Sequence, residues 1–248
     1  MKGVFYFYTL MPIKQLIRKT LLALRLDISK NLKYDRLTEK VLRKVLTLNS
    51  NCIDVGCHKG EILEQIIKLS PKGKHFAFEP IPVFYNNLKE KFSSKANIYP
   101  YALAEKEGVS TFLYVRNAPA YSGLKQRKYQ VKPDIEEISV EVKMLDEVIP
   151  KNTAINLIKI DVEGGELDVL KGAKGILETH KPTIIFECGL GASDYYHTKP
   201  EEVFSLLQSV ALNIFTLNSF LAKKMPLTEE EFVHLFNAGK EYYFVASK

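Results

Sequence analysis

The chain has few cysteines, and none of them has the spacing of a metal site. Cys52, Cys57 and Cys188 form no C-x-x-C pair and no cysteine–histidine set, which excludes the common zinc motifs. We therefore expect reduced, mostly buried thiols and a reducing compartment such as the cytoplasm. With 248 residues, the chain can bury a sizeable core without disulfide or metal staples.

The sequence also lacks a hydrophobic run long enough to cross a membrane. Its apolar start, residues 3–13, is about eleven residues long, whereas a spanning helix needs about 20. No basic leader of any length and no small-residue cleavage site accompany it, so no signal peptide is expected. Residues 13–26 have the pattern of an amphipathic cationic helix, which suits either an anionic membrane surface or the edge of a folded domain. Peripheral membrane contact through residues 1–30 is therefore a hypothesis.

Excess basic charge is confined to the N-terminal part of the chain. Of the net charge of +6, residues 1–44 carry +8, from eleven basic and three acidic side chains, which leaves −2 for the rest. An enzyme that acts on nucleic acid more often has its basic patch beside the active site, so we expect no nucleic-acid partner. The predicted organisation is a basic amphipathic helical appendage at residues 1–45 and one larger domain at residues 46–248. No pattern predicts the oligomeric state.

Strand-like and helix-like segments alternate from residue 51 onward. Apolar runs predict strands at residues 51–55, 75–79, 97–102, 155–160 and 183–187, and helical spacing predicts helices at residues 60–69, 81–92, 165–178 and 200–210. Two last runs, residues 212–217 and 242–246, are expected to pair antiparallel at the sheet edge. Buried strands separated by amphipathic helices predict a Rossmann-like α/β fold, with a mainly parallel sheet and helices on both faces.

Two half-exposed strands interrupt this rhythm. Residues 109–116 and 138–144 alternate polar and apolar side chains at period two. The connection between them is long and polar, and such loops are usually functional or mobile. Its aromatic and basic residues, Tyr121, Lys125, Arg127, Lys128 and Tyr129, suit a sugar that carries an anionic group. A solvated flexible loop fits the same composition.

A D-x-G-x-x-x-G turn follows the first predicted strand. Gly56 allows the backbone to approach a ligand, and Gly60 lets a helix begin close to the strand. The N-terminus of that helix attracts a carboxylate or another anion. A dinucleotide site usually reads G-x-G-x-x-G, but Cys57 and His58 stand in this stretch. A smaller anion, such as a methionine carboxylate, therefore fits better; a purely structural turn is the alternative.

An acidic residue ends the second predicted strand. Glu79 lies 23 residues after Gly56, close to the separation of about 20 at which a Rossmann unit places the acid that binds ribose hydroxyls. A carboxylate can accept hydrogen bonds from both hydroxyls. Glu79 is therefore predicted to bind the ribose of a nucleoside cofactor.

Further carboxylates gather where later strands end. Asp161, Glu163 and Glu166 follow the apolar strand at 155–160, and Glu187 ends the next one. Because carboxyl ends of parallel strands share one edge of the sheet, where ligands bind, Asp161, Glu163 and Glu187 are the candidate catalytic residues. Glu166 could equally support a helix dipole. Acidic side chains can hold Mg²⁺, but no EF-hand-like spacing occurs, and no metal is predicted.

These motifs, in this order, resemble the FkbM methyltransferases. The resemblance covers residues 50–188 and rests on DVGCHKG, FEP, YALAEKEG, the S-x-L of residues 122–124, LDEV, IKIDVEGGE, VLKGA and IIFE. IKIDVEGGE is the most family-specific of these motifs. The turn motif alone is common to many methyltransferases.

The resemblance implies a class I fold, S-adenosyl-L-methionine as donor and O-methylation of a hydroxyl on a small molecule or glycan, such as a glycolipid or polysaccharide sugar or a polyketide. The cofactor would contact Asp54, Gly56, His58 and Gly60 at its methionine end, Glu79 at the ribose, and Ala102 and Leu103 near the adenine. Asp161 and Glu163 would face the transferred methyl group, with His58 as the alternative base. An NAD(P)-dependent oxidoreductase or a non-catalytic Rossmann-like binding module are the rival functions.

Overall fold

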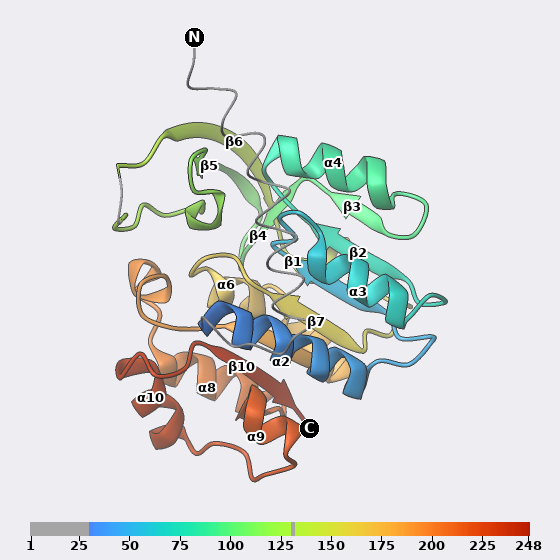
Figure 1. The fold of residues 1–248 in the computed structure, drawn as a ribbon, viewed down its shortest axis with the longest axis vertical. Helices are drawn as coiled ribbons and strands as arrows, with labels where there is room; N and C mark the ends of the chain where they lie inside the picture. Colours follow the sequence, from blue (N-terminus) through green and yellow to red (C-terminus); the bar gives the residue numbers. More distant parts are fainter. Residues whose placement is uncertain (1–29, 130–131) are drawn as a thin grey trace.

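A seven-stranded sheet forms the centre of the protein, seen in a computed structural model that describes residues 30–129 and 132–248. The strand order is β3-β2-β1-β7-β8-β10-β9 (Figure 1). The strands are β1 (Cys52–Val55), β2 (His75–Phe78), β3 (Asn97–Tyr99), β7 (Leu157–Ile160), β8 (Thr183–Glu187), β9 (Asn213–Thr216) and β10 (Tyr243–Ser247). The first five strands in this order are parallel, and β10 pairs antiparallel with both β8 and β9. The predicted Rossmann-like α/β fold with an antiparallel edge is confirmed.

Helices bury both faces of this sheet. The helices are α2 (Lys30–Val45), α3 (Glu61–Leu69), α4 (Pro82–Phe92), α5 (Leu145–Val148), α6 (Glu166–Lys171), α7 (Lys174–His180), α8 (Pro200–Ser209), α9 (Leu217–Leu221) and α10 (Glu229–Asn237). Helices α2, α3, α4 and α9 cover one face, and α5 to α8 with α10 cover the other (Figure 1). Every residue of β1, β2 and β7 is buried, which explains their nearly continuous apolar sequences.

A second, three-stranded sheet stands beside the first. It consists of β4 (Tyr101–Leu103), β6 (Ile135–Lys143) and β5 (Gly108–Val115), in that order. The strand expected at residues 97–102 is therefore divided at Pro100: β3 joins the large sheet and β4 the small one. The two period-two strands are confirmed as the antiparallel pair β5 and β6.

The prediction of one helix at residues 165–178 is wrong in one respect, because this segment forms two helices, α6 and α7. The break falls at Gly172, where a β-carbon would lie 2.2 Å from the carbonyl oxygen of Ala104. Close packing against the chain after β4 therefore requires glycine there. Helices α9 and α10 were not predicted, although Thr228 and Glu231 form a capping box at the start of α10.

Helix α2 packs on the sheet as part of the hydrophobic core. Tyr34, Leu37, Val41 and Leu42 are buried in a cluster that includes residues of β1, β7, β8 and β10. Residues 1–29, which contain the expected amphipathic helix at 13–26, lie outside the described residues, and the boundary at residue 45 stays a prediction. Within the described part of the chain, no helix is long and apolar enough to cross a membrane.

We predict that Leu42→Ala lowers the free energy of unfolding by about 2–5 kcal/mol, because it leaves a cavity under α2. Urea unfolding measures this change. Leu48→Ala is the matched control: Leu48 is 58% exposed, so its effect should stay within about 0.5 kcal/mol. Equal stability of the two variants would mean that α2 is a dispensable appendage.

Candidate functional site

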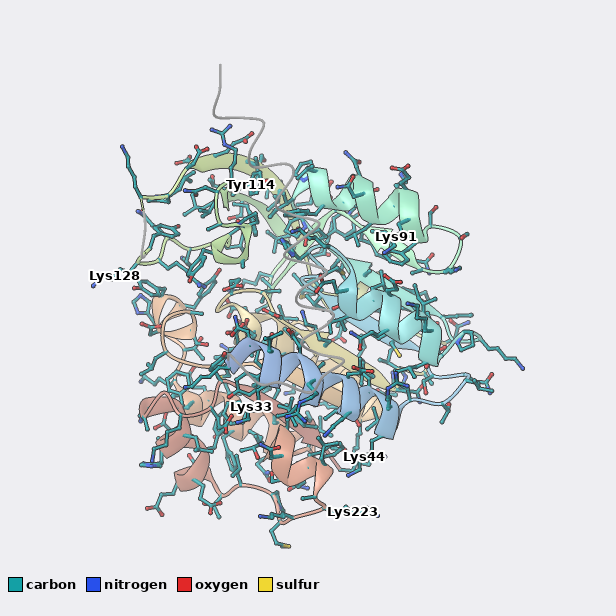
Figure 2. All side chains as sticks on the ribbon, viewed as in Figure 1. Lys33, Lys44, Lys91, Tyr114, Lys128 and Lys223 are labelled. Carbon is teal, nitrogen blue, oxygen red and sulfur yellow. The ribbon has the colours of Figure 1, made fainter. Side chains whose placement is uncertain are left out.

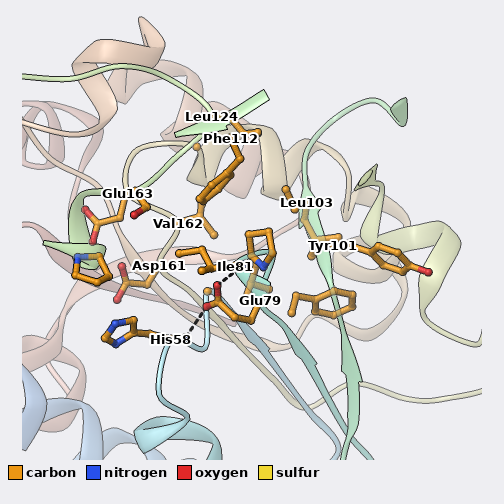
Figure 3. Close-up of a pocket in the computed structure, with 18 of the residues that line it drawn as sticks. His58, Glu79, Ile81, Tyr101, Leu103, Phe112, Leu124, Asp161, Val162 and Glu163 are labelled. Carbon is orange, nitrogen blue, oxygen red and sulfur yellow. Dashed lines mark hydrogen bonds between the residues drawn. The ribbon is translucent and has the colours of Figure 1, made fainter. Parts of the chain in front are cut away.

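A pocket lies at the carboxyl ends of the parallel strands, between the large sheet and the small one (Figure 3). This is the edge at which open α/β sheets bind ligands. Its lining includes the predicted residues Gly56, His58, Glu79, Ala102, Leu103, Asp161 and Glu163, together with Phe112 and residues 119, 120, 122 and 124. The structure therefore brings together residues from segments that lie far apart in the sequence. Asp54, Gly60 and Glu187 do not line the pocket itself.

The turn after β1 is shaped by two glycines with positive φ. Gly56 has φ 76°, and a β-carbon there would lie 1.9 Å from the carbonyl oxygen of Asp161. Gly60 also has φ 76°, and a β-carbon there would lie 2.6 Å from Leu88 of α4. Gly56 thus allows the turn to cross the loop after β7, and Gly60 allows α3 to begin against α4. Both positions require glycine for close packing.

Glu79 joins this turn to the start of α4. Its carboxylate accepts hydrogen bonds from the backbone N–H of His58, at 2.7 Å, and of Ile81, at 3.0 Å (Figure 3). Burial raises the pKa of Glu79 to about 7, although both N–H donors act against this shift. Each carboxylate oxygen has a further lone pair, so the group can still accept hydrogen bonds from a ligand.

The His58 ring is uncharged at neutral pH. Its centre lies 4.4 Å from that of Phe84, edge to face, and its Nε2 atom is buried without a hydrogen-bond partner among the described residues. Burial lowers the pKa of His58 to about 4. A group with this pKa is a weak base near pH 7, which weighs against His58 as the proton acceptor.

Three carboxylates meet beside the pocket. Oxygens of Asp161, Glu163 and Glu187 lie within 4.8 Å of one another. The Lys159 ammonium is 3.2 Å from Asp161, and the Arg127 guanidinium donates to Glu163 at 2.6 Å. The Tyr243 hydroxyl donates to Asp161. Two of the three predicted catalytic acids therefore already have cationic partners.

Glu166 has a different role from its neighbours. Its Oε1 accepts from the N–H groups of Val162, at 3.0 Å, and Gly164, at 3.1 Å. It therefore holds the loop after β7 in shape and does not join the cluster. The third carboxylate of the cluster belongs to Glu187, at the end of β8, and not to Glu166.

The three carboxylates differ in charge. Burial raises the pKa of Glu163 to about 8, with a further contribution from Asp161. Burial, and then the charges of Asp161 and Glu163, raise the pKa of Glu187 well above its usual range. Burial acts in the same direction on Asp161, but Lys159 and the Tyr243 hydroxyl outweigh it and lower that pKa. Asp161 is therefore the ionised member of the cluster.

A divalent cation fits this cluster poorly. Three carboxylates are a suitable ligand set for Mg²⁺, but Lys159 and Arg127 lie against two of them. Their positive charges would repel a bound cation, and they neutralise the acids without one. The cluster therefore consists of acidic and basic side chains alone, and it is a poor site for a metal ion.

Lys159 lies beneath the pocket and links both parts of the site. Its ammonium is 3.9 Å from Asp54 and 3.3 Å from the carbonyl oxygen of Gly56, and its side chain is only 7% exposed. The Asp54 oxygens have no hydrogen-bond partner among the described residues, and burial raises the pKa of Asp54 while Lys159 opposes this. Sequence reasoning gave Lys159 no role, although a charged residue within an apolar strand was a visible signal.

Part of the long connection after β5 lines the pocket, through residues 119, 120, 122 and 124. Ser122 Oγ accepts from the N–H of Val115 at 2.9 Å, and Gly123 exchanges two backbone hydrogen bonds with Leu113. The Leu124 N–H donates to the hydroxyl of Tyr196 at 3.0 Å. The hydroxyl bond explains the serine of the S-x-L motif, and the leucine is explained by its side chain, which lines the pocket and packs on a hydrophobic cluster. Tyr196 and Tyr243 were missed because they come from distant segments that carry no motif.

The family model of the methyltransferase FkbM domain matches residues 54–211 of this chain. The chain belongs to the FkbM methyltransferase family. It is 25% identical over 162 residues to the 2-O-methyltransferase NoeI of Sinorhizobium fredii, an alignment that covers 56% of this chain and 65% of that protein. It is 28% identical over 159 residues to the methyltransferase sdnD of Sordaria araneosa, covering 51% of this chain and 61% of that protein. The alignments thus span less than two thirds of either relative.

The fold of this FkbM chain is similar to a solved member of the family. The crystal structure of methyltransferase FkbM from Methylobacillus flagellatus KT superimposes with a TM-score of 0.50 and 15% sequence identity. The match covers 94% of this chain and 59% of that one. At this identity the likeness concerns the fold alone, and it agrees with the class I architecture of the central sheet.

We predict that Lys159→Met lowers the free energy of unfolding by about 3–5 kcal/mol, because the buried carboxylate of Asp54 and the half-buried one of Asp161 lose their counter-charge. Urea unfolding at neutral pH measures the change. Lys68→Met is the control, since Lys68 is 70% exposed and pairs with Glu64; it should cost less than about 1 kcal/mol. A Lys159→Met protein as stable as this control would refute the structural role of the buried ammonium.

Proposed function

We propose that the protein is an S-adenosyl-L-methionine-dependent O-methyltransferase that acts on a hydroxyl of a small molecule or glycan. One observation carries this proposal: the same pocket has the Glu79 carboxylate, anchored to the turn after β1, and the acids Asp161 and Glu163 on its lining. The first suits a nucleoside cofactor, and the second suits an acceptor hydroxyl. Family membership supports methyl transfer.

The residues at the cofactor end of the pocket fit S-adenosyl-L-methionine. Glu79 would accept from the ribose hydroxyls, and the apolar walls formed by Ala102, Leu103 and Phe112 would flank the adenine. The turn at Gly56 would lie against the methionine end, with Asp54 and Gly60 shaping it from behind. The bound cofactor supplies a methyl group on a positively charged sulfur, which needs no further activation.

The rival dehydrogenase function fits this turn less well. A dinucleotide needs a glycine where its pyrophosphate approaches the backbone, and the His58 ring lies against Phe84 in that stretch. A non-catalytic binding module would have no need for an ionised Asp161 facing a partly neutral Glu163. Binding of NAD alone would favour the dehydrogenase, and binding of S-adenosylhomocysteine without methyl transfer would favour the binding module.

At the acceptor end, the acids would orient the hydroxyl and take its proton. Transfer requires the acceptor oxygen in line with the methyl group, at about 3–3.5 Å. Asp161, held by Lys159 and Tyr243, would accept the hydroxyl hydrogen bond and set this direction. Glu163, whose pKa of about 8 lies near working pH, is the stronger proton acceptor of the two.

We predict that S-adenosylhomocysteine binds the wild-type protein and that Glu79→Ala weakens this binding about 10- to 100-fold, through loss of charged hydrogen bonds. Isothermal titration measures both affinities, with NAD as the competing ligand. Because the pKa of Glu79 is about 7 and its ionised form binds the ribose, wild-type affinity should fall roughly tenfold from pH 8 to pH 6. Binding of NAD alone would replace this proposal with the dehydrogenase function.

A second prediction separates catalysis from cofactor binding. Asp161→Asn should retain S-adenosylhomocysteine affinity within about twofold and lower methyl transfer by about 10²–10⁴-fold, because the acceptor loses its positioning carboxylate. The assay follows labelled methyl groups onto a panel of sugars, glycosides and lipid-linked glycans. Asp168→Asn, a half-buried aspartate on α6 outside the pocket, is the matched control. Unchanged transfer by Asp161→Asn would remove that residue from the mechanism.

A further inference from the structure

Arg127 is a buried cation in the connection between β5 and β6. Its neighbours Lys125 and Lys128 are exposed, and Figure 2 shows Lys128 projecting from the edge of the molecule. The Arg127 side chain, by contrast, is only 9% exposed. Its guanidinium carbon lies over the Tyr121 ring, 4.5 Å from the ring centre. Packing therefore fixes this side chain in place, and it is not a solvated loop cation.

The Nε–H of this guanidinium has no hydrogen-bond partner among the described residues. The Nη1 group donates to Glu163 at 2.6 Å. The Nε–H lies along a different edge of the planar fork from the N–H that binds Glu163. Leaving a buried donor unpaired is costly, so this edge marks a place where an acceptor atom of a ligand can bind.

A second unpaired donor adjoins the same aromatic ring. The Tyr129 hydroxyl is buried and has no hydrogen-bond partner in the described part of the chain. The Tyr129 ring meets the Tyr121 ring edge to face, with centres 6.5 Å apart, so Tyr121 lies against both Arg127 and Tyr129. A guanidinium N–H with a hydroxyl close by is a suitable donor set for the oxygens of a carboxylate or a phosphate.

These side chains adjoin the part of the pocket that holds the acids. Glu163, to which Arg127 donates, lines the pocket, and so do Ala120 and Ser122, on either side of Tyr121 in the chain. A group bound at Nε would lie one guanidinium away from the Glu163 carboxylate. A single sugar ring, or another small ring, spans such a separation.

Glu163 balances the charge of Arg127 only in part. Burial, with a contribution from Asp161, raises the pKa of Glu163 to about 8, so much of this acid is protonated near pH 7. Lys159, in contrast, lies 3.2 Å from the ionised Asp161. An anionic ligand group would therefore complete the compensation of a buried positive charge.

We propose that Arg127 and Tyr129 form a subsite for an anionic group of the acceptor, either a carboxylate or a phosphate. This group accepts from the Arg127 Nε–H and the Tyr129 hydroxyl, while a hydroxyl one ring away faces Asp161 and Glu163. The identity of the ligand as a methyl acceptor rests on the proposed methyltransferase function, whereas the anion subsite does not. A role as counter-ion of Glu163 alone would use one edge of the guanidinium and leave both donors unpaired.

The test compares ligands that differ only in the anionic group. Isothermal titration measures the affinities of phenyl glucuronide, phenyl glucoside and the glucoside phosphorylated at its primary hydroxyl, with and without S-adenosylhomocysteine. The corresponding galactose and mannose sets, and hydroxybenzoate beside hydroxybenzamide, extend the panel to other scaffolds. In at least one set, the wild-type protein should bind an anionic member at least about tenfold more tightly than the neutral one. The carboxylate and phosphate members show which anion the subsite takes.

Variants assign this preference to the subsite. Arg127→Gln should abolish it. Because that change also deprives Glu163 of its cation, Tyr129→Phe is a second test, which leaves the ion pair in place and should reduce the preference about fivefold. Arg116→Gln is the matched control: Arg116 follows β5, has a side chain that is 53% exposed and pairs with Asp134 at 2.7 Å. It should change the preference less than about twofold, and urea unfolding shows whether each variant is folded.

Equal affinities within every set would overturn the proposal. So would a preference that persists in Arg127→Gln or that Tyr129→Phe leaves unchanged, and Arg127 would then be the counter-ion of Glu163 alone. S-adenosylhomocysteine binding separates this proposal from the proposed function. Its presence with equal affinities would refute the subsite alone, whereas an anion preference without any S-adenosylhomocysteine binding would refute the methyltransferase function and leave the subsite standing.

Discussion

The candidate site depends on one buried ammonium group. Lys159 lies in the middle of the sheet with Asp54 on one side and Asp161 on the other, and it also donates to the backbone of the turn after β1. Burial alone would lower the pKa of Lys159, but the charges of Asp161 and Asp54 outweigh it and keep the group protonated. A single ammonium group therefore lies between the buried carboxylate of Asp54 and the half-buried one of Asp161, and it joins the turn after β1 to the acidic cluster.

Two further carboxylates, those of Glu79 and Glu166, hold the backbone around the pocket in place. Glu79 connects the turn after β1 to α4 through two backbone N–H groups, and Glu166 fixes the loop after β7 through two others. These carboxylates bind backbone donors that a tight turn leaves unpaired, which keeps the turns in shape without a bound ligand. Asp161 and Glu163 are consequently held at the pocket by a rigid scaffold.

Helix α2 belongs to this scaffold. Tyr34 of α2 packs against Tyr243, with ring centres 5.3 Å apart, and Tyr243 donates its hydroxyl to Asp161. The connection between β5 and β6 also reaches the cluster. Its Arg127 pairs with Glu163 and lies over the ring of Tyr121, 4.5 Å from the ring centre. Helix α2, strand β10 and the β5–β6 connection thus converge on one pair of acids.

The sequence by itself determined the fold class, the turn after β1 and the edge at which the acids gather, because these follow from local periodicity and from the rule that parallel strands end together. The sequence also proposed Asp161, Glu163 and Glu187 as one set, and the carboxylates of these three residues meet. Only the tertiary structure decided what each acid binds. Glu166 is nearer to Asp161 in sequence, yet Glu187 joins the cluster, because Glu166 is taken up by backbone donors of its own loop. Tyr243 is 82 residues from Asp161, and Arg127 is 36 residues from Glu163. Such pairings arise from packing between distant segments, for which a single sequence carries no local pattern.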